Sequence, residues 1–152
     1  INARAESVGR SRYFAQAFRE ARCLVPADGW YEWVRDRDGH KQPYYLTTGE
    51  PLMFAAIFAP GREDDSDPGV AILTEPARGV CRELHPRMPV VLHPRCWSTW
   101  LDPANHDRHA VRRAVEPVPG EQLRLWPVSP RVNRPAQDDP GLIERVAGTE
   151  SG

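Results

Sequence analysis

Proline is the feature that most limits what this chain can fold into. The 152 residues include 16 prolines, spread from Pro26 to Pro140. Each proline fixes its own φ, lacks a backbone donor and turns the preceding residue away from helical conformation. The sequence therefore disfavours long helices and predicts short strands, turns and extended segments. A chain of this length is expected to form a single domain with a real core.

The composition, 40% hydrophobic and 27% charged, is that of an ordinary globular protein. No apolar run reaches the roughly 18 residues of a membrane span and no secretory signal is visible, so we expect a cytoplasmic protein without a membrane partner. Cys23, Cys81 and Cys96 are an odd, sparse set, which favours a reducing compartment over a disulfide scaffold. The net charge of −1 gives no overall attraction to nucleic acid, and Lys41 is the only lysine. Any anion site must therefore be local and built from arginine.

The stretch from Leu84 to Leu92 is expected to be extended, because its two X-Pro bonds disfavour helical conformation. In an extended chain, residues i and i+2 project to the same side, so His85 and Arg87 should point together. Histidine exchanges protons near neutral pH, and arginine suits phosphate or carboxylate. The apolar run Val90–Leu92 predicts a buried strand that anchors the pair. On this stretch alone, a proline-rich loop with a solvated histidine fits at least as well.

The aromatic and β-branched residues of Trp30–Val34 predict a second informative strand. With a period of two, Glu32 lies on the same face of the strand as Trp30 and Val34. Tyr31 and Trp33 lie on the opposite face. A carboxylate flanked by apolar bulk has a raised pKa and can act as an acid or base. The alternative is an edge-strand glutamate that faces water.

The remaining pattern predicts an α+β domain that is mainly antiparallel β-sheet with a few peripheral helices. Helices are predicted at 3–8 with Asn2 as N-cap, at 11–21, 94–101 and 107–115, with at most a short helix at 77–84. Strands are predicted at 23–26, 30–34, 42–46, 52–58, 70–74 and 123–128. A hairpin turn is expected at 36–39, a turn at 47–50 and a surface loop at 61–69. The tail 131–152 is expected to be loosely ordered.

Several common kinds of site find little support. No serine lies in a G-x-S-x-G elbow, and phosphate-binding glycine loops are absent. Cys81, His85, His93 and Cys96 have the ligand types of a zinc site. Prolines and an apolar strand stiffen the chain between them, however, so neither a metal nor a cofactor is predicted.

Four stretches, taken in order, closely resemble one known family. They are Asn-Ala-Arg-Ala-Glu at 2–6, the run 22–33 ending Ala-Asp-Gly-Trp-Tyr-Glu-Trp, His-Pro-Arg-Met-Pro at 85–89, and Trp-Pro-Val-Ser-Pro-Arg-Val-Asn at 126–133. The family is SRAP, the SOS response-associated peptidases, which include the hydroxymethylcytosine-binding proteins of eukaryotes. The resemblance covers nearly the whole chain. It implies a single SRAP domain over 1–152, folded as a mostly β pseudo-barrel with a groove for single-stranded DNA.

The resemblance also implies a chemistry and a role in the DNA damage response. Family members crosslink to abasic sites through an N-terminal cysteine that is exposed when the initiator methionine is removed, and they have an associated autopeptidase activity. The amine and thiol of that cysteine condense with the sugar aldehyde to give a thiazolidine. Transferred by motif position, Asn2 would orient the cysteine, Glu32 would assist proton transfer at its amine, and His85 would act as acid or base on the opened sugar.

The resemblance assigns the binding of DNA to a second group of residues. Arg4 and Arg87 would hold the phosphates that flank the lesion, which fixes register without reading sequence. Thr74 is expected to line the same site. The partner implied is single-stranded DNA, above all abasic-site DNA, bound by a monomer at the nucleoid.

This chain departs from the family pattern at two points. The N-terminal cysteine and its segment are absent, because the sequence begins at Ile1, and Pro86 replaces the polar residue expected between His85 and Arg87. We therefore expect a fragment or processed product that lacks its N-terminal segment. Two hypotheses follow: a crosslinking SRAP enzyme whose upstream part is missing, and a noncatalytic truncated remnant that at most binds single-stranded DNA.

Overall fold

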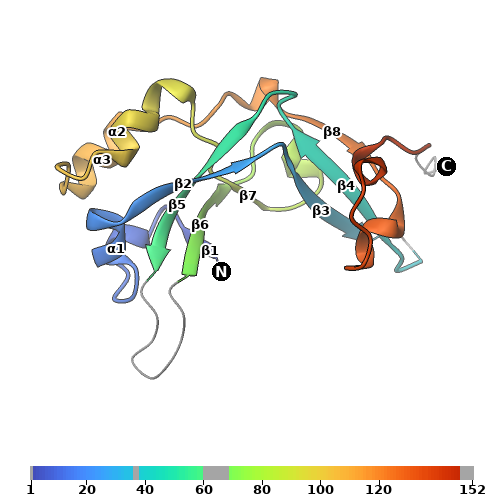
Figure 1. The fold of residues 1–152 in the computed structure, drawn as a ribbon, viewed down its shortest axis with the longest axis horizontal. Helices are drawn as coiled ribbons and strands as arrows, with labels where there is room; N and C mark the ends of the chain where they lie inside the picture. Colours follow the sequence, from blue (N-terminus) through green and yellow to red (C-terminus); the bar gives the residue numbers. More distant parts are fainter. Residues whose placement is uncertain (1, 36–37, 60–68, 148–152) are drawn as a thin grey trace.

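The strands form two separate sheets in a computed structural model that describes residues 2–35, 38–59 and 69–147 (Figure 1). The larger sheet has the order β1-β6-β5-β2, with β7 also paired to β6, and the smaller has the order β3-β4-β8. The bounds are β1 Asn2–Arg4, β2 Arg22–Ala27, β3 Trp30–Arg35, β4 Lys41–Thr47, β5 Leu52–Ala59, β6 Gly69–Pro76, β7 Arg87–Pro89 and β8 Arg124–Pro127. Among these strands, only β1 and β6 pair in parallel.

The helices are short, as the prolines require. The α-helices are α1 Ala15–Glu20, α2 Trp97–Leu101 and α3 Arg108–Ala114. The 3-10 helices are η1 Val8–Arg10, η2 Gly79–Glu83, η3 Pro94–Cys96, η4 Gly120–Gln122, η5 Pro130–Asn133 and η6 Pro140–Ile143. The α-helices gather at the end of the larger sheet that lies away from β3, β4 and β8 (Figure 1). None of the helices in the described part of the chain combines the length and the apolar character that crossing a bilayer requires.

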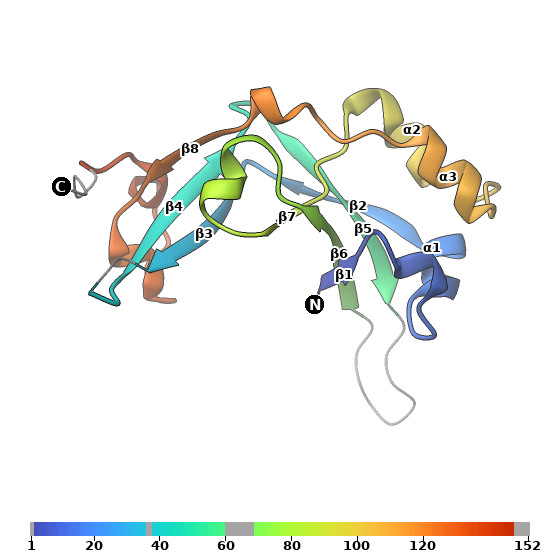
Figure 2. The ribbon, with the colours of Figure 1, turned by 180° about the vertical axis from the view of Figure 1, so that it is seen from behind.

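The predicted fold class, α+β with mainly antiparallel sheet, is confirmed. Apart from Val90–Leu92, each predicted strand lies within two residues of an observed one. The two sheets of the described residues do not close into a complete barrel. Figure 2 shows the segment from η2 to β7 lying between them, so residues of both sheets and of this segment can face one another.

The helix predicted over 3–8 is wrong. Asn2–Arg4 is strand β1, paired in parallel with Ile72–Thr74 of β6, and η1 follows after a turn. Ala3 is only 3% exposed and packs in the same cluster as Leu73. Burial of Ala3 and the hydrogen bonds of the pair outweigh the local helix preference of these residues, because propensity is only a weak prior beside tertiary contacts.

Three other elements differ in kind or extent from the prediction. The helix expected over 11–21 shrinks to α1, and the Ser11 hydroxyl accepts from the backbone N–H groups of Tyr13 and Phe14 in the turn before it. The helix expected over 77–84 is the 3-10 helix η2. Val90–Leu92 is buried as predicted but forms only isolated bridges. The hairpin turn at 36–39 and the loop at 61–69 fall largely outside the described residues.

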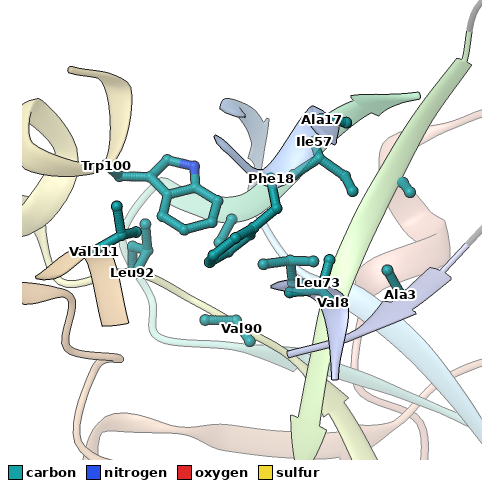
Figure 3. Packing of buried hydrophobic residues seen from close by; sticks show 12 residues of the cluster. Ala3, Val8, Ala17, Phe18, Ile57, Leu73, Val90, Leu92, Trp100 and Val111 are labelled. Carbon is teal, nitrogen blue, oxygen red and sulfur yellow. The ribbon is translucent and has the colours of Figure 1, made fainter. Parts of the chain in front are cut away.

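Two apolar clusters hold the sheets and helices together. In the first, Phe18 of α1 meets Trp100 of α2 edge to face at 5.8 Å, over the larger sheet (Figure 3). The second joins the two sheets, with Leu46 of β4, Phe54 of β5 and Met88 of β7 all buried in it. The second cluster therefore fixes the position of β7 relative to both sheets.

The C-terminal stretch is tied to the smaller sheet as far as residue 147. The Trp33 indole donates to Asn133 Oδ1 at 2.7 Å, and the Trp126 indole donates to the Ile143 carbonyl at 2.8 Å. The backbone N–H of Val146 donates to the Pro127 carbonyl at 3.0 Å. These bonds give residues 131–147 a defined path where the sequence predicts loose order. Residues 148–152 lie outside the described part.

Candidate functional site

A pocket of about 370 Å³ lies where β1, β3, β5, β6 and β7 meet. All six residues singled out from the sequence line it, although they come from four separate segments: Asn2, Arg4, Glu32, Thr74, His85 and Arg87. The structure thus brings together every residue to which the family resemblance assigns a role.

One wall of the pocket is built by the parallel pair of β1 and β6. Strand side chains alternate between the two faces of a sheet. Ala3 turns to the core, whereas Asn2 and Arg4 lie on the pocket side and are exposed. Their register partners, Ile72 and Thr74, line the same wall. The pairing of β1 with β6, which are distant in sequence, therefore places residues 2–4 beside Thr74.

Glu32 stands in the opposite wall on β3, beside Trp30, as the period of two predicts. It is partly buried, and its side chain makes no hydrogen bond with any described residue. Burial raises the pKa of Glu32, and the positive charge of nearby His85 opposes that rise. A carboxyl group with a raised pKa exchanges protons closer to neutral pH.

His85 is exposed at the edge of the pocket, in the turn before β7. Its Nδ1 lies 3.1 Å from the Arg87 backbone nitrogen and 2.9 Å from the Arg87 carbonyl oxygen. Because an amide N–H is always a donor, Nδ1 of the neutral ring accepts from it and the ring proton resides on Nε2. In the charged ring, Nδ1–H faces the carbonyl oxygen instead. Both protonation states of His85 therefore have a partner in the same peptide backbone.

The Arg87 guanidinium lies in the pocket with His85, but its terminal nitrogens are already engaged. Nη2 donates to the Thr74 carbonyl at 2.6 Å and to the Thr74 hydroxyl at 3.0 Å. Nη1 and Nη2 also donate to the two carboxylate oxygens of Glu6, at 2.8 and 3.1 Å. These bonds lower the pKa of Glu6. The sequence reasoning gave Glu6 no role, although the residue ends the motif at 2–6.

The rest of the lining is mostly apolar. Trp30 meets Phe54 edge to face at 5.9 Å, and Ile72, Met88 and Pro89 complete the floor. The period of two along β3 predicts from the sequence that Trp30 shares the pocket face with Glu32. Phe54 has no such signal, because it lies in a continuous apolar run whose two faces cannot be told apart by pattern.

The four residues with zinc-ligand types do not converge. Cys81 is buried in the apolar cluster that joins the sheets. This burial raises the pKa of its thiol to about 11, and the charge of Glu32 adds to the rise. His93 caps η3 and lines a different pocket, and Cys96 is buried. Within the described residues, no group of three His, Cys, Asp or Glu side chains is arranged to hold a metal ion.

Comparison with known proteins points to one family. The family model SOS response associated peptidase (SRAP) matches residues 1–135. The chain is 30% identical over 148 residues to the abasic site processing protein YoqW of Bacillus subtilis, covering 95% of this chain and 66% of that protein. It is 33% identical over 150 residues to the abasic site processing protein YedK of Escherichia coli, covering 96% of this chain and 67% of that one.

A solved structure has the same fold. The crystal structure of a protein from Bacteroides thetaiotaomicron superposes with a TM-score of 0.82 at 22% identity, covering 96% of this chain and 66% of that one. At that identity the likeness concerns the fold alone. In each of these comparisons, the chain spans about two thirds of the length of its relative.

Proposed function

This chain belongs to the SOS response-associated peptidase (SRAP) family, and we propose that its pocket processes abasic sites in DNA. The observation that carries the proposal is the convergence of Asn2, Glu32 and His85 with two arginines in one pocket. Relatives that are 30 and 33% identical are named abasic site processing proteins, which supports the same substrate. An abasic site exposes the aldehyde of its ring-opened sugar, and the pocket holds two groups able to move protons around such a carbon.

The proposed reaction is condensation of that aldehyde with an N-terminal cysteine. Glu32 takes a proton from the ammonium group, and the free amine attacks the carbonyl carbon. The oxygen leaves as water with one proton from the attacking nitrogen and one from His85, and the remaining proton of the nitrogen returns to His85, which leaves an imine. The thiolate of the same cysteine then adds to the imine carbon and the nitrogen takes up a proton, which closes a thiazolidine. The Asn2 amide is proposed to orient the cysteine.

The substrate proposed is single-stranded DNA. Arg4 is exposed on the pocket wall, and its side chain has no hydrogen bond or ion pair with the described residues, so it is available for phosphate. Arg87 and Thr74 are proposed to contact the backbone beside it. Trp33 is 41% exposed and offers a face for base stacking. We extend the proposal to a monomer that acts at the nucleoid and to autopeptidase activity, since the same acid and base suit amide hydrolysis.

A second candidate function is DNA binding without covalent chemistry. It is favoured by the positions of the cysteines, because none of Cys23, Cys81 and Cys96 lines the pocket. An internal cysteine also has its nitrogen tied up in an amide, and a thiazolidine needs an amine and a thiol on adjacent carbons.

Denaturing gels of protein mixed with uracil-excised, single-stranded oligonucleotide distinguish the two candidates. The chain that begins at Ile1 is expected to give no heat-stable shifted band. The polypeptide translated from the first initiation codon upstream of Ile1 is expected to give one, and Glu32→Gln or His85→Ala is expected to slow its appearance. A stable band from the Ile1 chain would overturn the assignment of the nucleophile. Absence of a band from the longer polypeptide would overturn the crosslinking function.

A further inference from the structure

Strand β7, which forms part of the pocket floor, is short and makes few backbone hydrogen bonds to β6. It has three residues, and because hydrogen-bonded pairs alternate along an antiparallel ladder, only Met88 of the three is placed to bond to β6, at Glu75. The Pro86 carbonyl accepts from Ala77 at 2.9 Å, and beyond the strand Val90 donates to Leu73 at 2.9 Å. The backbone N–H and carbonyl of residue 87 therefore turn away from β6 toward His85 Nδ1, which leaves the side chain to anchor this residue to that strand.

The side chain of Arg87 supplies that anchor. It reaches across to β6 and donates to both the carbonyl and the hydroxyl of Thr74. The carboxylate of Glu6 accepts two further hydrogen bonds from the Arg87 guanidinium. Paired donors facing a carboxylate fix orientation as well as distance, so this geometry specifies one placement of Arg87.

Glu6 is itself held from the α-helical end of the molecule. Arg112 of α3 donates through Nη2 to the carbonyl oxygens of Ala5 at 2.7 Å and of Glu6 at 2.9 Å. A continuous chain of polar contacts thus runs from Arg112 to Glu6, from Glu6 to Arg87, and from the Arg87 backbone to His85 Nδ1.

We propose that Glu6 is a positioning residue, which, held by Arg112, fixes the Arg87 backbone so that His85 keeps its Nε2-protonated tautomer in the pocket. One part of this inference rests on the proposed function: the catalytic role in which His85 Nε2–H is the proton donor. The arrangement of the imidazole is a property of the folded chain and can be measured without DNA.

Ring nitrogen NMR of ¹⁵N-histidine-labelled protein tests this directly, at an alkaline pH above which the ring signals no longer change. The signals of His85 are identified by their absence in His85→Gln. In the unsubstituted chain, its two ring nitrogens are expected to be widely separated, with Nε2 protonated. In Glu6→Gln, which loses the charge and one acceptor oxygen but keeps the shape, the two signals are expected to converge toward their common average.

Matched variants control for indirect effects. Arg112→Gln is expected to move the His85 signals in the same direction, whereas Arg113→Gln, at the exposed next position of α3, should leave them unchanged. Glu83→Gln removes an exposed glutamate outside the chain of contacts and should also leave them unchanged. Backbone amide spectra establish that each variant is folded. Glu6 and Arg112 are both exposed, so neither substitution removes core packing.

The outcomes separate this inference from the proposed function. Unchanged His85 signals in both Glu6→Gln and Arg112→Gln would overturn the positioning role, whatever the protein does to DNA. Movement in Glu6→Gln alone would overturn the part assigned to Arg112. If the long polypeptide fails to crosslink abasic DNA while His85 responds as expected, the proposed function falls and the positioning role stands.

Discussion

Replacing Glu32 by glutamine is expected to stabilise the fold while it impairs the chemistry. Glu32 is partly buried in the pocket wall and its side chain has no hydrogen-bond partner among the described residues. The carboxylate oxygens of Glu32 keep contact with solvent, because they are not among the buried atoms that lack a partner, so only part of the cost of desolvating the charge applies. Glutamine has the same shape without the charge, so we expect the free energy of unfolding to rise by about 1 kcal/mol at neutral pH.

The pH dependence of this gain has a definite sign. Burial raises the pKa of Glu32 above its ordinary value of 4.5, so the folded state keeps a proton that the unfolded chain has lost. The free energy of unfolding of the unsubstituted protein therefore falls as pH rises from the unfolded pKa to the folded one. Glutamine does not titrate. The advantage of Glu32→Gln should be complete above this window and should disappear as the pH falls below 4.5.

Urea unfolding followed by tryptophan fluorescence at a series of pH values measures the difference. Glu83→Gln is the matched control, because Glu83 is exposed at the end of η2, and it should change the free energy of unfolding little at any pH. A Glu32→Gln protein that is less stable at neutral pH, or whose gain does not shrink on acidification, would refute the reasoning. The same variant should crosslink abasic DNA more slowly in the longer polypeptide.

Three further predictions concern other parts of the chain. Arg4→Ala should lower the salt dependence of single-stranded DNA binding, measured by fluorescence anisotropy, by about 0.7 in log–log slope. Arg87→Ala should change that slope less, because Glu6 already neutralises the guanidinium. Gly29→Ala should destabilise the fold by about 1–3 kcal/mol or more in thermal unfolding, since the added Cβ would stand 2.3 Å from the Leu46 carbonyl oxygen. Mass spectrometry after alkylation should find the Cys81 thiol unmodified in folded protein at neutral pH, given its burial and a pKa of about 11.

The parts of the site that follow local rules were predictable from the sequence. Alternation along β3 puts Glu32 beside Trp30 and away from Trp33, and the structure has this arrangement. The extended stretch before Val90 places His85 and Arg87 in one pocket. In each case a backbone periodicity acts over a few residues, and no long-range contact is needed to decide it.

The parts that depend on pairing between distant segments were not predictable in this way. Nothing in residues 2–8 distinguishes a helix from a strand until β6 is available as a partner, 70 positions away at the pair Asn2 and Ile72. The family resemblance brought Asn2 and Arg4 into the site, but it did not supply their conformation. Phe54 was missed because both faces of β5 are apolar, so pattern cannot say which one borders a pocket.

The prolines that exclude long helices also explain why this site depends on a side-chain anchor. Pro86 and Pro89 keep the chain beside His85 extended, and Pro86 has no N–H to return to Ala77, whose N–H donates to the Pro86 carbonyl. A strand in that condition needs another attachment, and Arg87 provides it through Thr74 and Glu6. The need for an anchor can be read from the sequence. Its identity cannot, because Glu6 lies 81 positions from Arg87 and is brought to it only by the pairing of β1 with β6.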